Sequence, residues 1–170
     1  MFITNATSED VSFIVQLLNS AYRGATSRQG WTTEAHLIAG DVRTNEESVL
    51  QVMEQPDSVI LKCCDDDGRM VGTVNLQQQA SKIYLGMFAV APALQGKGIG
   101  KQLLEAAENH ARNTGCTAIY MHVISVRNEL INWYRRHGYR DTGLRKPFVE
   151  DGLTGRHLQP LEFAVLEKEV

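Results

Sequence analysis

The chain has 170 residues, of which 43% are hydrophobic and 22% charged, and its formal net charge at pH 7 is −3. These totals are ordinary for a soluble globular protein, and we expect residues 1–170 to form a single domain. The slight negative charge argues against a general nucleic-acid binder, which would present a basic surface, and gives no reason to expect binding to an anionic membrane.

The N-terminal residues and the cysteines indicate a cytoplasmic protein. Residues 1–3 lead directly into the run 4–7 (TNAT), without the basic segment and long apolar core of a secretory signal. No apolar run is long enough to span a bilayer. The chain has three cysteines, Cys63, Cys64 and Cys116, and no Cys-x-x-Cys motif. An odd number without this motif is no disulfide framework, so we expect reduced thiols.

The first part of the chain predicts one strand and two helices. A short strand is expected at 2–5, and a helix over 8–22 begins at a capping pair formed by Thr7 and Asp10. A second capping pattern starts a helix within 44–55, which ends because a proline follows.

The segment between these helices is rich in glycine and hydroxyl residues, and it is the least regular part of the sequence. Residues 33–38 are compatible with a short helix. Trp31 is a large aromatic residue in a polar loop. It either pins this loop to the domain or forms a wall of a substrate pocket, since loops on a rigid scaffold carry specificity.

A β-hairpin follows. Alternation predicts strands at 58–64 and 70–76, joined by the turn 65–68, and another turn at 77–81. The turn 65–68 contains three consecutive aspartates. They lack the spacing of a calcium loop, so we interpret them as a solvated turn and expect no metal site.

The central stretch combines a strand, a glycine-rich turn and a helix. The apolar run 83–90 has the length of a buried strand, and Pro92 ends its hydrogen-bond ladder. The turn Gln95-Gly96-Lys97-Gly98-Ile99-Gly100 follows, and an amphipathic helix starts from it. Free amides at a helix start, glycines without a Cβ and nearby lysines predict a site for a phosphate or pyrophosphate.

Two common phosphate motifs do not fit this turn. A Walker loop needs Gly-Lys followed by Ser or Thr, whereas Gln102 follows Gly100 and Lys101. The dinucleotide fingerprint Gly-x-Gly-x-x-Gly places its last glycine at Lys101 or Leu103. The sequence therefore predicts neither a Walker loop nor a dinucleotide-binding turn here.

The remaining elements complete an alternating pattern. The central helix is expected to end near 114–115, and a long loop rich in glycine and proline occupies 146–160. The last elements are strands at 118–123, 139–144 and 161–166, and a helix from Asn128 to Gly138.

The glycine turn matches the pattern Gln/Arg-x-x-Gly-x-Gly/Ala at Gln95, Gly98 and Gly100, and the run 88–92 (FAVAP) precedes it. Further on, Asn128 is followed by Tyr134, Gly138 and Tyr139. Both patterns and the order of elements resemble the GNAT superfamily of N-acetyltransferases. The resemblance implies an α/β fold with a mixed, mostly antiparallel sheet of six or seven strands, flanked by helices, whose fourth and fifth strands splay apart.

By this resemblance, acetyl-CoA lies in a wedge between the strands 83–90 and 118–123. The strand backbone is expected to hold the pantetheine arm, an amide near Phe88 or Ala89 to polarise the thioester, and the turn amides to hold the pyrophosphate. The lysines are either flanking charges or solvated surface residues. The residues expected at the cofactor are Phe88, Ala89, Val90, Gln95, Gly96, Lys97, Gly98, Ile99, Gly100, Lys101, Asn128 and Tyr134.

Tyr134 matches the tyrosine that relatives place near the coenzyme sulfur, where a phenol can donate a proton to the departing thiolate. The other interpretation is a core aromatic residue on the buried face of its helix. The expected reaction is direct attack of an amine on the thioester, which needs no covalent enzyme intermediate and leaves Cys116 without a catalytic role.

The base that accepts the amine proton is not evident. Some relatives carry an acid or a histidine near the middle of the strand 83–90, and this chain has neither there. His122, on the same face of the next strand as Tyr120, is one candidate, Glu34 is a weaker one, and a water chain is a third.

The acceptor is expected to be the primary amine of a small molecule. Trp31, Glu34, Tyr84 and Phe148 are the candidate substrate residues, and the loop 146–160 is expected to overhang the acceptor site. The alternatives are a non-catalytic acyl-CoA sensor and a protein or peptide N-acetyltransferase. The chain is expected to act as a monomer or a homodimer, without nucleic acid or membrane.

Overall fold

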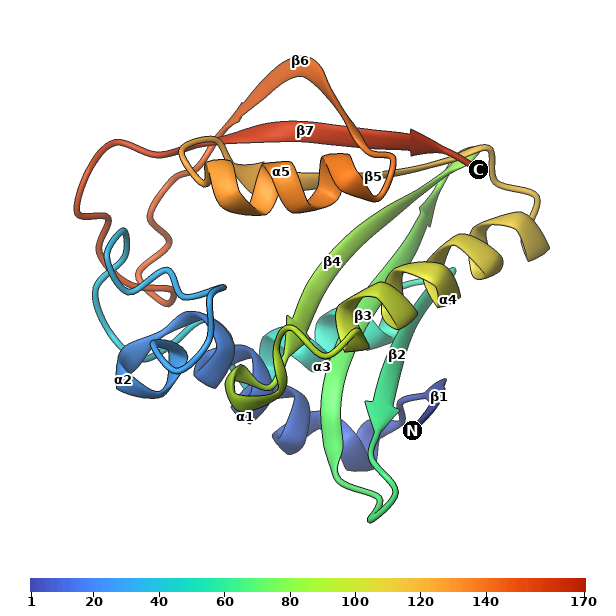
Figure 1. Ribbon diagram of the computed structural model, residues 1–170, viewed down its shortest axis with the longest axis horizontal. Coiled ribbons are helices and arrows are strands. Elements are labelled where there is room, and N and C mark those ends of the chain that lie inside the picture. The colour runs from blue at the N-terminus through green and yellow to red at the C-terminus, as the bar shows by residue number, and fades with distance from the viewer.

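The computed structural model describes all 170 residues, which form a seven-stranded sheet with helices on both faces (Figure 1). The sheet order is β1-β2-β3-β4-β5-β7-β6, and only β4 and β5 are parallel neighbours. This confirms the predicted mixed, mostly antiparallel sheet. The strands are β1 (Phe2–Asn5), β2 (Ser58–Cys64), β3 (Met70–Gln79), β4 (Lys82–Val90), β5 (Ala118–Ile124), β6 (Arg140–Pro147) and β7 (Glu162–Glu169).

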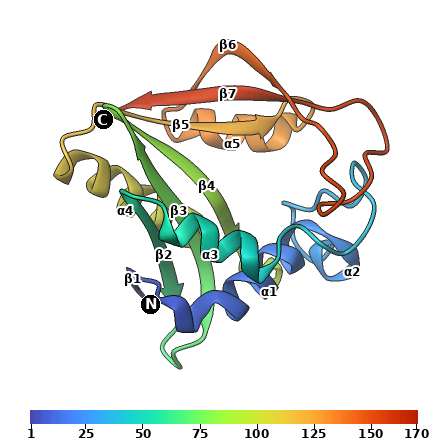
Figure 2. The same cartoon turned by 180° about the vertical axis from the view of Figure 1, so that it is seen from behind.

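The helices divide between the two faces. In Figure 1, α4 and α5 lie in front of the sheet, and the reverse view of Figure 2 brings α1 and α3 to the front. The helices are α1 (Val11–Tyr22), α2 (Gly24–Ser27), α3 (Glu46–Glu54), α4 (Ile99–Asn113) and α5 (Asn128–Arg136). No helix is long and apolar enough to cross a membrane.

Both capping patterns predicted from the sequence are present at the helix starts. The backbone N–H of Thr7 donates to Oδ2 of Asp10 at 2.8 Å, and a short 3₁₀ turn, Ser8–Asp10, leads into α1. Asn45 caps α3 through its Oδ1, which accepts from the N–H of Ser48 at 2.9 Å. These bonds satisfy amides that have no partner inside the helix.

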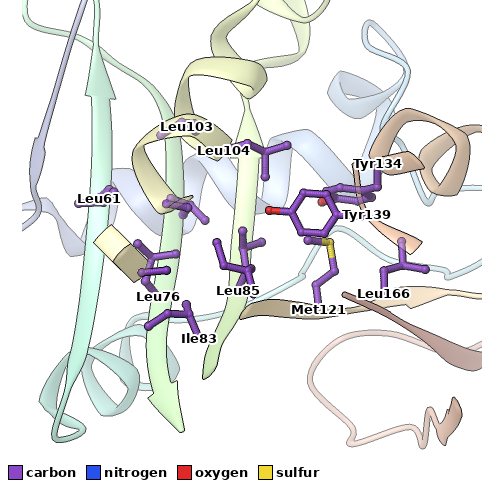
Figure 3. Packing of buried hydrophobic residues seen from close by; sticks show 14 of the residues in the cluster. Leu61, Leu76, Ile83, Leu85, Leu103, Leu104, Met121, Tyr134, Tyr139 and Leu166 are labelled. Carbon is purple, nitrogen blue, oxygen red and sulfur yellow. The ribbon is translucent and has the colours of Figure 1, made fainter. Parts of the chain in front are cut away.

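Each face of the sheet has its own hydrophobic core. The larger core has 21 buried residues and lies between the sheet and the helices α4 and α5 (Figure 3). In that core Tyr134 of α5 packs edge-on against Tyr139, with ring centroids 5.8 Å apart. The smaller core has eight buried residues and joins α1 and α3 to β2 and β4. Both faces of β4 are therefore covered by packed side chains.

The parallel pair β4 and β5 separates soon after it begins. Only Lys82–Tyr84 pairs with Ala118–Tyr120, although β4 continues to Val90. Figure 1 shows the two strands diverging from the side where the C-terminus lies. β5 instead pairs with β7 along its whole length. This confirms the splayed fourth and fifth strands, which leave a wedge in the sheet.

A β-bulge interrupts β4 beside this wedge. Met87 has a left-handed backbone, with φ +47°, which is uncommon for a residue with a side chain. The β3–β4 register shifts between Thr73 and Asn75, so that Met87 and Phe88 both lie opposite Val74. Such a bulge increases the local bend of the strand and redirects its backbone groups.

Three sequence predictions of local structure are wrong. Residues 33–38 form a turn rather than a helix, because Ile38 pairs with His157 and the isolated segment is too short to sustain helical hydrogen bonds. Residues 77–79 belong to β3 rather than to a turn, because their ladder with β4 continues to Lys82. The loop 146–160 is shorter than predicted, because β6 extends through its first two residues.

Candidate active site

Two cavities follow one another along β4, one lined by residues 88–90 of this strand and the other by residues 84–88. The larger has a volume of about 270 Å³ and extends toward the glycine-rich turn, and the smaller has about 100 Å³ and extends along β5. The two cavities have four lining residues in common. The residues that line both are Tyr22, Phe88, Leu130 and Tyr134.

The glycine-rich turn forms an open end of the larger cavity. Gly96 and Gly98 have left-handed backbones, with φ +81° and +87°, and a Cβ on either would meet no atom within 4 Å. Gly98 is the N-cap of α4, and no side chain caps this helix. The first amides of α4 are therefore available to an anion, as the sequence predicts.

Gly100 is a glycine for a different reason. A Cβ at this position would lie 3.3 Å from Cζ2 of Trp133, whose indole packs against the start of α4. Trp133 lines the larger cavity and lies against His137, with ring centroids 4.3 Å apart. Neither aromatic residue was predicted at the site. Trp133 falls in the helix expected from Asn128 to Gly138, at the aromatic position before Tyr134.

The side chain of Gln95 connects the glycine-rich turn to the loop that contains Trp31 and Thr32. Its Oε1 accepts from the N–H of Trp31 at 2.7 Å, and its Nε2 donates to Oγ1 of Thr32 at 2.7 Å and to the carbonyl of Val90 at 3.0 Å. The structure places Trp31 at the larger cavity, 6.2 Å from Trp133 between ring centroids, and not at the smaller one. Gln95 therefore braces the walls of the larger cavity.

The predicted cationic and amide residues are distributed unevenly. Lys101 lines the larger cavity and lies 3.9 Å from Glu105, whereas Lys97 is exposed and lines neither cavity. Asn128 is the exposed first residue of α5 and also lines neither. Lys101 is thus the one lysine of the pair whose charge lies at the cavity wall.

Two tyrosines stand at the junction of the cavities. The hydroxyl of Tyr22 donates a hydrogen bond to the carbonyl of Phe88. Tyr134 is 5% exposed, and burial raises its pKa well above the usual value. The hydroxyl is protonated at neutral pH, as for any phenol with a pKa of 10 or more, and can act as a donor. Tyr22 was not predicted here, since nothing local to α1 indicates a contact with β4.

Aromatic side chains surround His122 in the smaller cavity. Its ring lies 5.1 Å from that of Tyr84 and 5.7 Å from that of Phe163, and Phe148 stacks on Phe163 at 4.3 Å. Burial, and then the positive charge of Lys146, lower the pKa of His122 from its ordinary value of 6.5. The imidazole is therefore neutral at pH 7 and can accept a proton.

Glu34 lies at the same cavity but is already paired. Its Oε1 is 2.5 Å from Nη1 of Arg23, and its Oε2 is 3.2 Å from Nη1 of Arg127. The three side chains are buried. A carboxylate whose two oxygens are both held by guanidinium groups is poorly placed to accept a proton from an amine. The two arginines, and Arg43 on the cavity wall, were not predicted.

The acids of the overhanging loop are committed to the loop itself. Oε1 of Glu150 accepts from the N–H of His157 at 2.6 Å, and Oδ1 of Asp151 accepts from the N–H groups of Leu153 and Thr154 at 2.9 Å. Neither acid lines the smaller cavity, although Phe148 of the same loop does. The loop therefore supplies an aromatic wall and no negative charge.

Comparison with known families and curated proteins gives a consistent result. The model of the acetyltransferase (GNAT) family matches residues 14–139. The chain is 31% identical over 93 residues to streptothricin acetyltransferase from Streptomyces lavendulae, a match that covers 54% of this chain and 49% of that protein. The matches with curated relatives span between 22% and 59% of the length of those proteins.

Solved structures share the fold. The ribosomal-protein-alanine N-acetyltransferase from Brucella melitensis superposes with a TM-score of 0.75 at 19% identity, covering 100% of both chains. A GNAT family acetyltransferase from Elizabethkingia anophelis, solved with acetyl-CoA bound, superposes with a TM-score of 0.60 at 18% identity, covering 74% of this chain and 84% of that one. At these identities the likeness establishes the fold alone.

Proposed function

The chain belongs to the acetyltransferase (GNAT) family, and on this premise we propose that it transfers an acetyl group from acetyl-CoA to the primary amine of a small molecule. The observation that carries the proposal is the shared wall of the two cavities at Phe88 and Tyr134. One cavity ends at free helix amides and the other contains a neutral imidazole. A phosphate-bearing donor and an amine acceptor would therefore meet at this wall.

The larger cavity has the features needed to hold acetyl-CoA. The uncapped start of α4 and the open surface over Gly96 and Gly98 suit a pyrophosphate, with Lys101 as a neighbouring charge. Trp133 and Leu94 give the cavity an apolar wall. Acetyl-CoA, when bound, supplies the thioester whose acetyl group is transferred.

The end of β4 is the proposed position of the reacting carbonyl group. The bulge at Met87 redirects the backbone just before Phe88 and Ala89, whose amides are the candidate donors to the carbonyl oxygen. Such a donor stabilises the negative charge that develops on that oxygen as the amine adds. Tyr134, which like any phenol is protonated at neutral pH, then donates its proton to the departing sulfur.

His122 is the proposed acceptor of the amine proton. It lines the smaller cavity together with Tyr134 and Phe88, and its lowered pKa keeps it neutral at pH 7. The attacking amine thus loses its proton to this imidazole, while the leaving sulfur gains one from the tyrosine. Transfer of a proton from the imidazolium to the tyrosinate through water restores both groups. Glu34 is set aside as the base because both of its oxygens are paired with arginines.

The dimensions of the smaller cavity favour a small acceptor over a protein chain. Its volume of about 100 Å³ is below the ~300–1,000 Å³ of sites that enclose drug-sized ligands. The loop that follows β6 contributes Phe148 to the cavity wall and is fastened to the segment 37–39 by the Ile38–His157 bridge. An extended peptide would have to displace these fastened loops.

The proposal is tested by following thiol release from acetyl-CoA with a broad panel of amines. Turnover with at least one amine, reduced strongly in Tyr134→Phe, is the expected result. Tyr120→Phe is a matched control, because the Tyr120 hydroxyl bonds the exposed side chain of Gln79. Tight binding of acetyl-CoA without turnover on any amine would favour a sensor instead, and no affinity for acetyl-CoA would rule out both.

A further inference from the structure

The cluster of charges at the smaller cavity carries more positive than negative charge. Arg43, Arg127 and Glu34 line the cavity, and Arg23 lies behind Glu34. Glu34 is the only carboxylate on the cavity wall, and its oxygens are taken by Arg23 at 2.5 Å and Arg127 at 3.2 Å. Three guanidinium groups therefore lie in this cluster, and its one carboxylate pairs with two of them.

Arg43 is the arginine that this carboxylate leaves without a partner. It is half-buried, forms no ion pair, and its guanidinium carbon lies 5.8 Å from the centroid of the Tyr22 ring. Nη2 of the fully buried Arg23 also has no hydrogen-bond partner. Positive charge that is removed from water without a counter-charge is costly. The missing negative charge can be supplied by a ligand in the cavity.

No other part of the protein supplies a negative charge to Arg43. Glu150 and Asp151 are bonded to their own loop and lie outside the cavity. Lys146, whose charge lowers the pKa of His122, adds further positive charge nearby. A dication such as a polyamine would therefore meet repulsion at this site.

We propose that the acceptor is a small amine that also carries a carboxylate, as an α-amino acid does, and that Arg43 binds this carboxylate beside Arg127. This rests on the proposed acetyl transfer and specifies which amine receives the acetyl group. The planar guanidinium presents paired N–H donors that match the two oxygens of a carboxylate. The amine of the same molecule is left to face His122 and the shared wall at Phe88.

The surroundings suit the two halves of such an acceptor. Excess positive charge disfavours a protonated amine, so it favours the neutral amine that attacks the thioester. The stacked rings of Phe148 and Phe163 form an apolar wall for a side chain. The cavity volume of about 100 Å³ limits that side chain to a few atoms beyond the reacting groups.

The test compares free amino acids with their carboxamides, which keep the side chain and the α-amine but lose the negative charge. A carboxamide has the less basic amine and hence more neutral amine at pH 7, so intrinsic reactivity favours it. Thiol release from acetyl-CoA is measured for both series and for simple diamines. In parallel, calorimetry measures the binding of each series to the coenzyme-A-loaded protein, which requires no chemistry.

Two variants make the test specific. Arg43→Gln is expected to raise KM and Kd for the preferred amino acid by about tenfold or more, with its carboxamide unchanged. Arg43→Lys should recover part of this loss, because the charge remains and the paired donors do not. Arg69→Gln, in the exposed β2–β3 turn, is the control and should behave as the wild type.

The outcomes separate this inference from the proposed function. Amino acids that bind or react better than their carboxamides, with a preference that Arg43→Gln removes, support it. Equal or better binding of carboxamides or diamines, or no binding of any amino acid, overturns it even if acetyl transfer to some amine is observed. Absence of turnover with clear, Arg43-dependent binding of amino acids would instead refute the transfer and leave the recognition site standing.

Discussion

The hydroxyl of Tyr22, the last residue of α1, donates a hydrogen bond to the carbonyl of Phe88 in β4, 66 residues further along the chain. Both residues line both cavities. Burial raises the pKa of Tyr22, so this hydroxyl remains a donor throughout the neutral range. The bond ties the helix to the strand at the place where donor and acceptor are proposed to meet.

Tyr22→Phe removes this bond and keeps the ring. Because the Phe88 carbonyl then loses a donor, we expect the free energy of unfolding to fall by about 1 kcal/mol. For a chain of this size that lowers Tm by about 2–4 °C, which circular dichroism can measure. Tyr120→Phe, which loses an exposed bond to Gln79, should shift Tm less. Equal shifts in the two variants would contradict a structural role for the Tyr22 bond.

Gly98→Glu tests the anion site at the start of α4. It places a side chain and a negative charge in the open space over the turn, so we expect calorimetry to detect no acetyl-CoA binding. Gly68→Glu is the matched control, because Gly68 also has a left-handed backbone, φ +80°, and open space in a remote turn. Both variants should lose about 1–2 kcal/mol of stability from backbone strain. Wild-type affinity in Gly98→Glu would exclude this site.

His122→Gln tests the proposed base. We expect kcat at pH 7 to fall by about 10²–10⁴-fold, the usual contribution of a general base. In the wild type, kcat should begin to fall only when the pH drops to the lowered pKa of His122. The pH–rate profile of the variant should lack this decrease. His110→Gln is the control, because burial also lowers the pKa of His110, which lies on α4 and lines neither cavity.

The pH dependence of the free energy of unfolding should also reflect the titration of His122. The pKa of His122 is lower in the folded protein than the ordinary 6.5 of the unfolded chain. Its contribution to the free energy of unfolding is therefore complete well above pH 6.5, where the imidazole is neutral in both the folded and the unfolded state. As the pH falls below 6.5 the unfolded chain takes up the proton first, and the contribution is lost by the time the pH has passed the folded-state pKa. Urea unfolding at several pH values should show a smaller acid loss in His122→Gln. An unchanged pH dependence would refute this linkage.

Glu34→Gln tests the buried charge cluster. It leaves the side chains of Arg23 and Arg127, which are 0% and 7% exposed, without their counter-charge. Removing one partner of a buried pair costs about 3–5 kcal/mol, so we expect a large fall in the free energy of unfolding. Glu105→Gln breaks a pair with Lys101 that is more than half exposed and should cost less than about 1 kcal/mol. Similar losses in the two variants would contradict the importance of burial.

The sequence predicts the surroundings of the glycine-rich turn because they are local. The strand, the turn from Gln95 to Gly100 and the helix start follow one another within about twenty residues, and their hydrogen-bonding needs can be read from glycine, proline and apolar spacing alone. The same holds for Thr7 and Asn45 as helix caps, whose partners lie three residues away.

The arginines of the smaller cavity could not be predicted in the same way, because they reach this cavity only in the folded protein. Arg43 precedes α3, Arg127 precedes α5, and each has a surface residue's sequence context. The turn at 35–37 forms because Ile38 pairs with a residue more than a hundred positions later. No local pattern distinguishes an arginine that will face a cavity from one that will face water.

The short seam between β4 and β5 also divides the sheet mechanically. In the backbone ladder only three residue pairs join the block of β1 to β4 to the block of β5 to β7, although side chains of the larger core pack across both. Opening at this seam breaks few backbone bonds, so amide hydrogen exchange near it should proceed through a low-energy local fluctuation. A ligand that contacts both blocks penalises that fluctuation, and its arrival should slow exchange on both sides of the wedge. The place where the sheet is weakest is therefore the place where binding can most stiffen it.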